Sequence, residues 1–150
     1  MKALYAGSFD PFTIGHYDIA YRALTIFSKL VIGVGYNELK RGEMPVEERV
    51  RRINKIFEKD SRVSVESYSG LTVDFAKKIG AGLLIRGVRN GTEFDKEKEL
   101  ADINLMVLGI PTVILPAKPS YSFISSSMVR ELKHNGYDVT PYLPDETIEF

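Results

Sequence analysis

Short apolar runs alternate along the chain with segments in which apolar residues recur at helical spacing. Runs rich in Val, Ile and Leu predict five β-strands, at residues 2–6, 30–36, 62–68, 82–85 and 111–116. The segments between and after them predict five helices, at residues 15–27, 46–57, 72–79, 92–109 and 126–134. Pro45 begins the second helix and Gly80 ends the third, as expected from the conformational preferences of these residues.

This alternation of strands and helices predicts the fold class. Five strand–helix units with short apolar strands favour an α/β fold, a doubly wound parallel sheet of five strands with helices on both faces. The chain has 150 residues and shows no linker, repeat or low-complexity segment, so we expect residues 1–150 to form a single domain.

The unusual polar segments all follow predicted strands. They are residues 7–16 (GSFDPFTIGH), 37–42 (NELKRG), 69–72 (SGLT), 86–91 (RGVRNG) and 117–127 (AKPSYSFISSS). Because the carboxyl ends of parallel strands meet at one edge of a sheet, these segments are expected to converge there, where ligands of such folds bind. Their Lys, Arg, His and Ser side chains indicate an anionic ligand with several phosphates.

Three of these segments carry features typical of phosphate binding. Gly15 and His16 fall in the first turn of a predicted helix, where free N–H groups favour a phosphate. The serines at 125–127 begin another helix, and Arg86 and Arg89 offer fork-shaped donors to phosphate oxygens. Commoner explanations exist for several of these residues. A serine run is usually a helix N-cap, Asp10-Pro11 is a common turn sequence, and an arginine at a strand end is usually a surface charge.

Composition narrows the class of function. Lys and Arg together number 20, as do Asp and Glu, so the formal net charge is zero and favours neither nucleic acid nor an anionic membrane as partner. There is no cysteine and there are two histidines, so we expect no disulfide, no thiol nucleophile and no dedicated metal site of the protein. No signal peptide and no membrane-length apolar run is visible, which predicts a soluble, cytoplasmic protein.

The motifs resemble those of a known enzyme family. Segment 7–16 is similar to the (S/T)-F-D-P-x-T-x-G-H signature of the nucleotidyltransferase superfamily, and 122–131 (SFISSSMVRE) to its second signature. Residues 47–50 (EERV), 69–76 (SGLTVDFA) and 84–104 (LIRGVRNGTEFDKEKELADIN) resemble the bacterial phosphopantetheine adenylyltransferases in particular. The resemblance covers nearly the whole chain and implies a Rossmann-like fold.

The resemblance also implies a reaction, in which the adenylyl group of ATP passes to 4′-phosphopantetheine to give dephospho-CoA and pyrophosphate, with Mg²⁺ held mainly by ATP phosphates and water. It implies catalytic roles for His16, Lys40 and Arg86, and acceptor binding by Ser8, Lys40, Thr72 and Arg86. The ATP-binding residues that it implies are Ser8, Phe9, His16, Gly87, Val88, Arg89, Glu97, Tyr121, Ser122, Phe123, Ile124, Ser125, Ser126 and Ser127. It further implies a cytoplasmic homohexamer with possible feedback binding of CoA.

Two departures and two alternatives accompany this interpretation. Ala6 stands where many members of the family have proline, and Lys96 where they often have an aromatic residue next to the acidic position of Glu97. One alternative is another adenylyl- or cytidylyltransferase of the superfamily, acting on nicotinate mononucleotide or a polyol phosphate. The other is a nucleotide sensor without catalytic activity.

Overall fold

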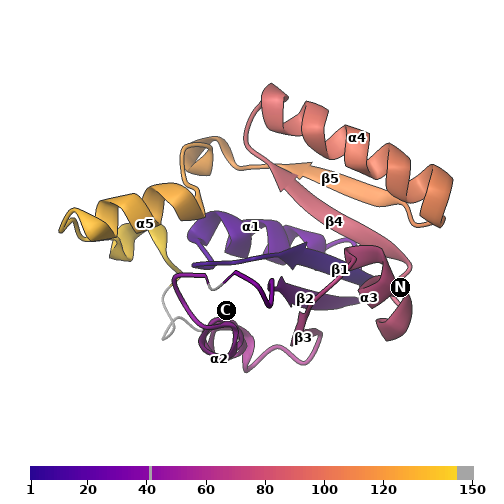
Figure 1. Cartoon of the computed structure of the whole chain (residues 1–150), viewed down its shortest axis with the longest axis horizontal. Coiled ribbons are helices and arrows are strands. Elements are labelled where there is room, and N and C mark those ends of the chain that lie inside the picture. Colours follow the sequence, from indigo (N-terminus) through magenta and orange to yellow (C-terminus); the bar gives the residue numbers. More distant parts are fainter. Residues whose placement is uncertain (41, 145–150) are drawn as a thin grey trace.

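The computed structural model describes residues 1–40 and 42–144, and its centre is a parallel sheet of five strands in the order β3-β2-β1-β4-β5 (Figure 1). The strands are β1 (Lys2–Gly7), β2 (Lys29–Gly35), β3 (Val63–Tyr68), β4 (Leu83–Val88) and β5 (Thr112–Pro116). The helices are α1 (Ile14–Ala23), α2 (Val46–Phe57), α3 (Thr72–Ile79), α4 (Gly91–Leu108) and α5 (Ser126–His134). The predicted α/β architecture is therefore confirmed.

Helices cover both faces of the sheet because alternate strand residues point to opposite sides. Tyr5 and Ile32 pack with residues of α1 and α2 in one core cluster. Leu4 and Val31 pack with residues of α3 on the other face. The two clusters fix the register of the central strands, since a slip of one residue would exchange their apolar faces.

Glycines end two of the helices, at Gly80 as predicted and also at Gly109. Gly80 and Gly109 both adopt left-handed backbone conformations, with φ of 72° and 73°, at the ends of α3 and α4. In the part of the chain that the structure describes, no helix is long and apolar enough to cross a membrane.

Two predicted ends were wrong by three or more residues. Strand β4 runs to Val88 rather than ending at residue 85, because Arg86, Gly87 and Val88 pair with β5 although they interrupt the apolar run. Helix α1 ends at Ala23 rather than near residue 27, and the Thr25 hydroxyl donates to the Arg22 carbonyl at 2.6 Å in the turn that follows.

Candidate active site

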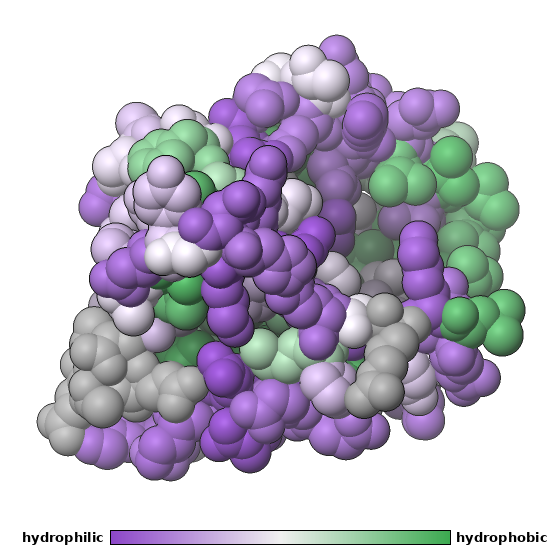
Figure 2. All heavy atoms as spheres, turned by 60° about the vertical axis from the view of Figure 1, so that its left-hand side comes forward, coloured by the Kyte–Doolittle hydropathy of each residue, from purple (hydrophilic) through white to green (hydrophobic). Residues whose placement is uncertain are grey.

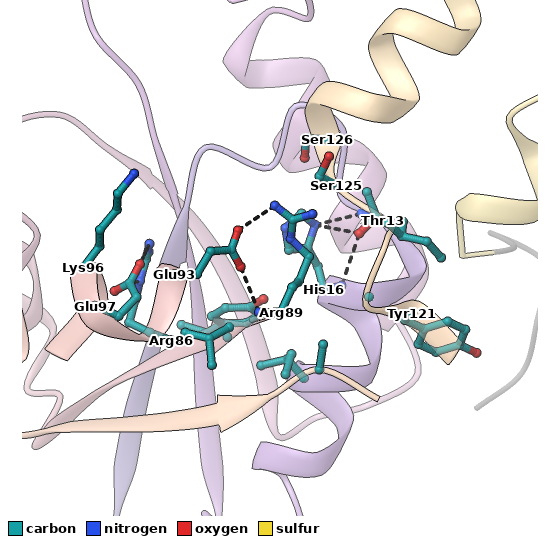
Figure 3. Close-up of a pocket in the computed structure, with 17 residues that line it drawn as sticks. Thr13, His16, Arg86, Arg89, Glu93, Lys96, Glu97, Tyr121, Ser125 and Ser126 are labelled. Atoms are coloured by element: carbon teal, nitrogen blue, oxygen red, sulfur yellow. Dashed lines mark hydrogen bonds and ion pairs between the residues drawn. The ribbon is translucent and has the colours of Figure 1, made fainter. Parts of the chain in front are cut away.

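A cavity of about 370 Å³ lies at the carboxyl edge of the sheet, between the starts of α1, α4 and α5 and the end of β4 (Figure 3). The face of the molecule in Figure 2 is mostly hydrophilic, with a hydrophobic area along one side. The cavity brings together ten of the predicted site residues, namely His16, Arg86, Gly87, Val88, Arg89, Glu97, Tyr121, Ile124, Ser125 and Ser126. Segments separated by more than 100 residues in the sequence thus meet at one edge, as their positions after strands predicted.

At the start of α1, the His16 imidazole is held in one orientation by the helix cap. Thr13 is the N-cap; its side chain accepts from the His16 N–H at 3.3 Å, and its own backbone N–H donates to His16 Nδ1 at 2.9 Å. This is a capping box in which histidine takes the place usually held by Glu or Gln. A backbone amide can only donate, so Nδ1 is the acceptor and the neutral ring carries its proton on Nε2.

The surroundings of His16 keep this ring neutral. Burial, and then the charges of Arg86 and Arg89, lower the pKa of His16 from its ordinary 6.5 to about 4. The Phe9 and Phe12 rings support the imidazole, with centroid distances of 5.1 and 5.5 Å. At neutral pH, His16 therefore offers one N–H donor from Nε2.

Arg86 and Arg89 each pair with a carboxylate of α4. Arg86 donates from Nε and Nη2 to the two oxygens of Glu97, at 3.0 and 2.7 Å, and from Nη1 to the Ala6 carbonyl at 2.6 Å. Glu93 accepts from the backbone N–H of Arg89 at 2.8 Å and from its guanidinium at 2.5 Å. The bidentate pair with Glu97 fixes the planar guanidinium of Arg86, and Glu93 holds Arg89 through one guanidinium nitrogen and the backbone N–H. Both arginines keep further guanidinium N–H groups free for a ligand.

Helix α5 is joined to the loop that follows β1. The Ser126 hydroxyl donates to the Pro11 carbonyl at 2.8 Å, and Arg130 Nη1 donates to the Asp10 carbonyl at 2.6 Å. Ser125 is the N-cap of α5 and accepts from the Met128 N–H, which confirms the commoner reading of this serine run. A direct contact of these serines with a ligand stays a prediction.

Asp10 is a structural residue of the same loop. Its carboxylate accepts from the backbone N–H groups of Glu43 and Met44, at 2.9 and 3.1 Å. Asp10-Pro11 was interpreted as a turn. The structure adds that the Asp10 side chain connects this loop to the segment after β2.

Seven predicted site residues do not line the cavity, and these are Ser8, Phe9, Lys40, Thr72, Ser122, Phe123 and Ser127. The exposed Lys40 lines a second hollow of about 390 Å³ beside the segment after β2. Thr72 shares a hydrogen bond with the Tyr68 hydroxyl at 2.8 Å. Phe9 is only 3% exposed and contributes to the cavity through its contact with His16. Their predicted roles stay predictions.

Two residues important for this geometry were missed, although each has a signal in the sequence. Arg49 is buried and donates to the carbonyls of Ser8, Gly35 and Met44; it is a charged residue on the apolar face of α2. Glu93 stands three residues after the N-cap Asn90, the position of the acidic residue in a capping box. Its carboxylate binds Arg89 instead of the N-cap amide.

Comparison with known proteins places this site in a family. A model of the cytidylyltransferase-like family matches residues 4–132. The phosphopantetheine adenylyltransferase of Phocaeicola vulgatus is 47% identical over 144 residues, which are 96% of this chain and 95% of that protein. The phosphopantetheine adenylyltransferase of Porphyromonas gingivalis is 47% identical over 143 residues, 95% of this chain and 94% of the relative.

A solved structure supports the fold independently. The chain superposes on a bifunctional NMN adenylyltransferase/ADP ribose pyrophosphatase from Francisella tularensis with a TM-score of 0.72 and 14% sequence identity. The match covers 97% of this chain but 45% of the bifunctional protein, so it bears on the fold alone. The family model covers most of the chain, and the 47% identity to these relatives extends over nearly its whole length. The chain therefore belongs to the cytidylyltransferase-like family and, within it, to the phosphopantetheine adenylyltransferases.

Proposed function

We propose that this protein transfers the adenylyl group of ATP to 4′-phosphopantetheine, releasing pyrophosphate and forming dephospho-CoA in coenzyme A biosynthesis. The observation that carries the proposal is the meeting of the His16 donor, two arginines and the starts of α1 and α5 in one cavity. The 47% identity to phosphopantetheine adenylyltransferases supports this particular reaction among those of the family.

The chemistry requires positioning and charge stabilisation rather than a strong base. An oxygen of the acceptor phosphate is already anionic and attacks the α-phosphorus of ATP. The bond from that phosphorus to the bridging oxygen of the β-phosphate breaks, and the electron pair leaves with pyrophosphate. Donors fixed before the reaction lower the barrier, because they face charge that grows on the transferring group.

The residues of the cavity fit these tasks. In this proposal, the Nε2–H of His16 donates to an oxygen of the transferring phosphoryl group. The free N–H groups of Arg86 and Arg89 and the amides that begin α1 and α5 bind phosphate oxygens. Lys40 binds the acceptor from the second hollow, Thr72 and Ser8 add further contacts to it, and the 121–127 segment binds the nucleotide.

The donor set indicates how Mg²⁺ would reach the site. Among residues 1–40 and 42–144, no group of three His, Asp or Glu side chains is placed to hold a metal ion. The cavity carboxylates Glu93 and Glu97 are bound to arginines. These residues therefore fit a Mg²⁺ ion that enters bound to ATP. Such an ion would neutralise part of the phosphate charge, and Mg²⁺ commonly keeps phosphate and water ligands.

We also propose a cytoplasmic homohexamer that binds CoA as a feedback ligand. Support for self-association comes from α4, whose outer face exposes Ile103, Met106 and Val107. A large exposed apolar area on a folded chain is typical of an interaction surface.

A panel of substrates tests the proposed reaction. Purified protein is incubated with ATP or CTP and with 4′-phosphopantetheine, nicotinate mononucleotide or a polyol phosphate, and pyrophosphate release is followed. We expect turnover with ATP and 4′-phosphopantetheine, and a product with the mass of dephospho-CoA. A preference for CTP or for another acceptor would indicate a different transferase. ATP binding without pyrophosphate from any acceptor would indicate a sensor.

A further inference from the structure

The charges around the cavity do not cancel. Its lining contains the cations Arg86, Arg89 and Lys96 and the carboxylates Glu93 and Glu97, while the low pKa of His16 keeps that ring neutral. Each arginine is paired with one carboxylate, Arg86 with Glu97 and Arg89 with Glu93. The excess positive charge of the cavity therefore resides on Lys96.

Lys96 is also the cavity cation that has no partner. Among the residues that the structure describes, it forms no hydrogen bond or ion pair, whereas Lys98, two positions along the same helix, binds Asp102 at 2.7 Å. Figure 3 shows the Lys96 side chain extending from α4 without a dashed line to any neighbour. An exposed ammonium group on a flexible stem offers three donors to an incoming anion.

Its place in the cavity indicates which anion it meets. Lys96 lies on the side of Arg86 and Glu97, and Thr13, His16, Ser125 and Ser126 lie at the other end (Figure 3). The starts of α1 and α5 at that other end suit the phosphates of the nucleotide. The phosphate of the second substrate then enters on the side of Arg86, whose charge is offset by Glu97 and which already makes three hydrogen bonds.

We propose that Lys96 is a recognition residue for the phosphate of the acceptor, a specificity contact that rests on the proposed function. A phosphate monoester carries a charge between about −1.5 and −2 at pH 7. Both arginines of the cavity already have a carboxylate partner, so among the cations that line this cavity the ammonium of Lys96 is the one best able to attract this dianion, while Lys40 lies in the second hollow. The contact is made before and during the reaction alike, which predicts an effect on acceptor binding rather than on turnover.

Steady-state kinetics of matched variants test the assignment. In Lys96→Met we expect the KM for 4′-phosphopantetheine to rise about fivefold, as for loss of one partly exposed ion pair. The KM for ATP and kcat should stay within about twofold of wild type, since the phosphates of ATP bind elsewhere in the cavity. Lys96→Arg should restore the acceptor KM, and Lys98→Met, which removes a lysine outside the cavity, should leave all three constants unchanged.

Binding in the absence of turnover separates the phosphate from the rest of the acceptor. Calorimetric titration with 4′-phosphopantetheine and with unphosphorylated pantetheine gives the preference for the phosphate, which Lys96→Met should reduce about fivefold. With an active wild type, any of three results would overturn the assignment. They are an unchanged preference for the phosphate, a rise in the ATP KM instead of the acceptor KM, and an equal effect of Lys98→Met. A wild-type protein that releases no pyrophosphate from 4′-phosphopantetheine overturns the proposed function and this assignment together.

Discussion

His16 is the residue whose chemistry the surrounding structure controls most closely. The cap of α1 commits Nδ1 to the Thr13 amide, and two arginines help keep the ring neutral. We expect His16→Ala to lower kcat by about 10²–10³-fold, the usual cost of removing one fixed donor to a transition-state oxygen. Acceptor KM should change little. The control is His134→Ala, which removes the other histidine, on the exposed end of α5; equal turnover of His16→Ala and wild type would contradict the role.

The low pKa of His16 also predicts how stability depends on pH. The ring titrates near 6.5 when unfolded and near 4 when folded, so between these values the unfolded chain binds more protons. The free energy of unfolding therefore falls as the pH drops from 7 toward 4, and His16 contributes about 2–3 kcal/mol of this fall. His16→Gln keeps an acceptor for the Thr13 amide but has no titrating ring. Its free energy of unfolding should therefore fall by about 2–3 kcal/mol less than that of the wild type over the same pH range. Urea unfolding at pH 7 and 4.5 measures both proteins, and identical pH dependence would exclude this explanation.

At the scale of elements, Arg49 joins α2 to the loop that carries the first signature motif. Its guanidinium is buried and donates to the carbonyls of Ser8, Gly35 and Met44. Arg49→Met leaves these carbonyls without their donor, and we expect the free energy of unfolding to fall by about 2–4 kcal/mol. Arg52→Met is the matched control, because Arg52 makes a half-exposed pair with Glu48 and should change stability by less than about 1 kcal/mol. Denaturant titration gives both values, and equal losses would contradict the role of Arg49.

The sequence pattern predicted which elements form better than where they end. In the part of the chain that the structure describes, the pattern located the five strands and the five α-helices. Burial on a sheet or helix face imposes the apolar spacing on most of them, whereas α4 buries no residue. The pattern missed the last three residues of β4, where backbone pairing with β5 continues past the apolar run. Gly87 serves packing there, since a Cβ at this position would lie 3.1 Å from Cγ1 of Ile19 in α1.

The candidate site was predictable where topology alone determines position. Residues after parallel strands share one edge, and so His16, Arg86 and Ser125 were expected together. The pairing of each arginine with a carboxylate of α4 was not predictable, because it depends on how that helix lies across the sheet. Lys40 and Thr72 lie outside the main cavity, and sequence spacing could not distinguish one hollow at this edge from two.

For the whole molecule, the exposed side of α4 predicts self-association. Met106 is 82% exposed and Val107 74%, although both are apolar. Replacing both by Glu places charges in the proposed interface, and we expect light scattering after gel filtration to show a smaller species than the wild-type protein forms. Lys133→Glu on α5 is the control and should leave the assembly intact. A monomeric wild type, or a double variant of unchanged mass, would contradict an interface at α4.

The reverse reaction tests the central claim most directly. Purified protein with dephospho-CoA, pyrophosphate and Mg²⁺ should form ATP, followed by luciferase luminescence, and His16→Ala should form it about 10²–10³-fold more slowly. NAD⁺ and pyrophosphate, the products of the related transfer to a nicotinamide nucleotide, should yield no ATP with this enzyme. ATP formed from NAD⁺ but not from dephospho-CoA would contradict the assigned acceptor, and ATP from neither would contradict adenylyl transfer itself.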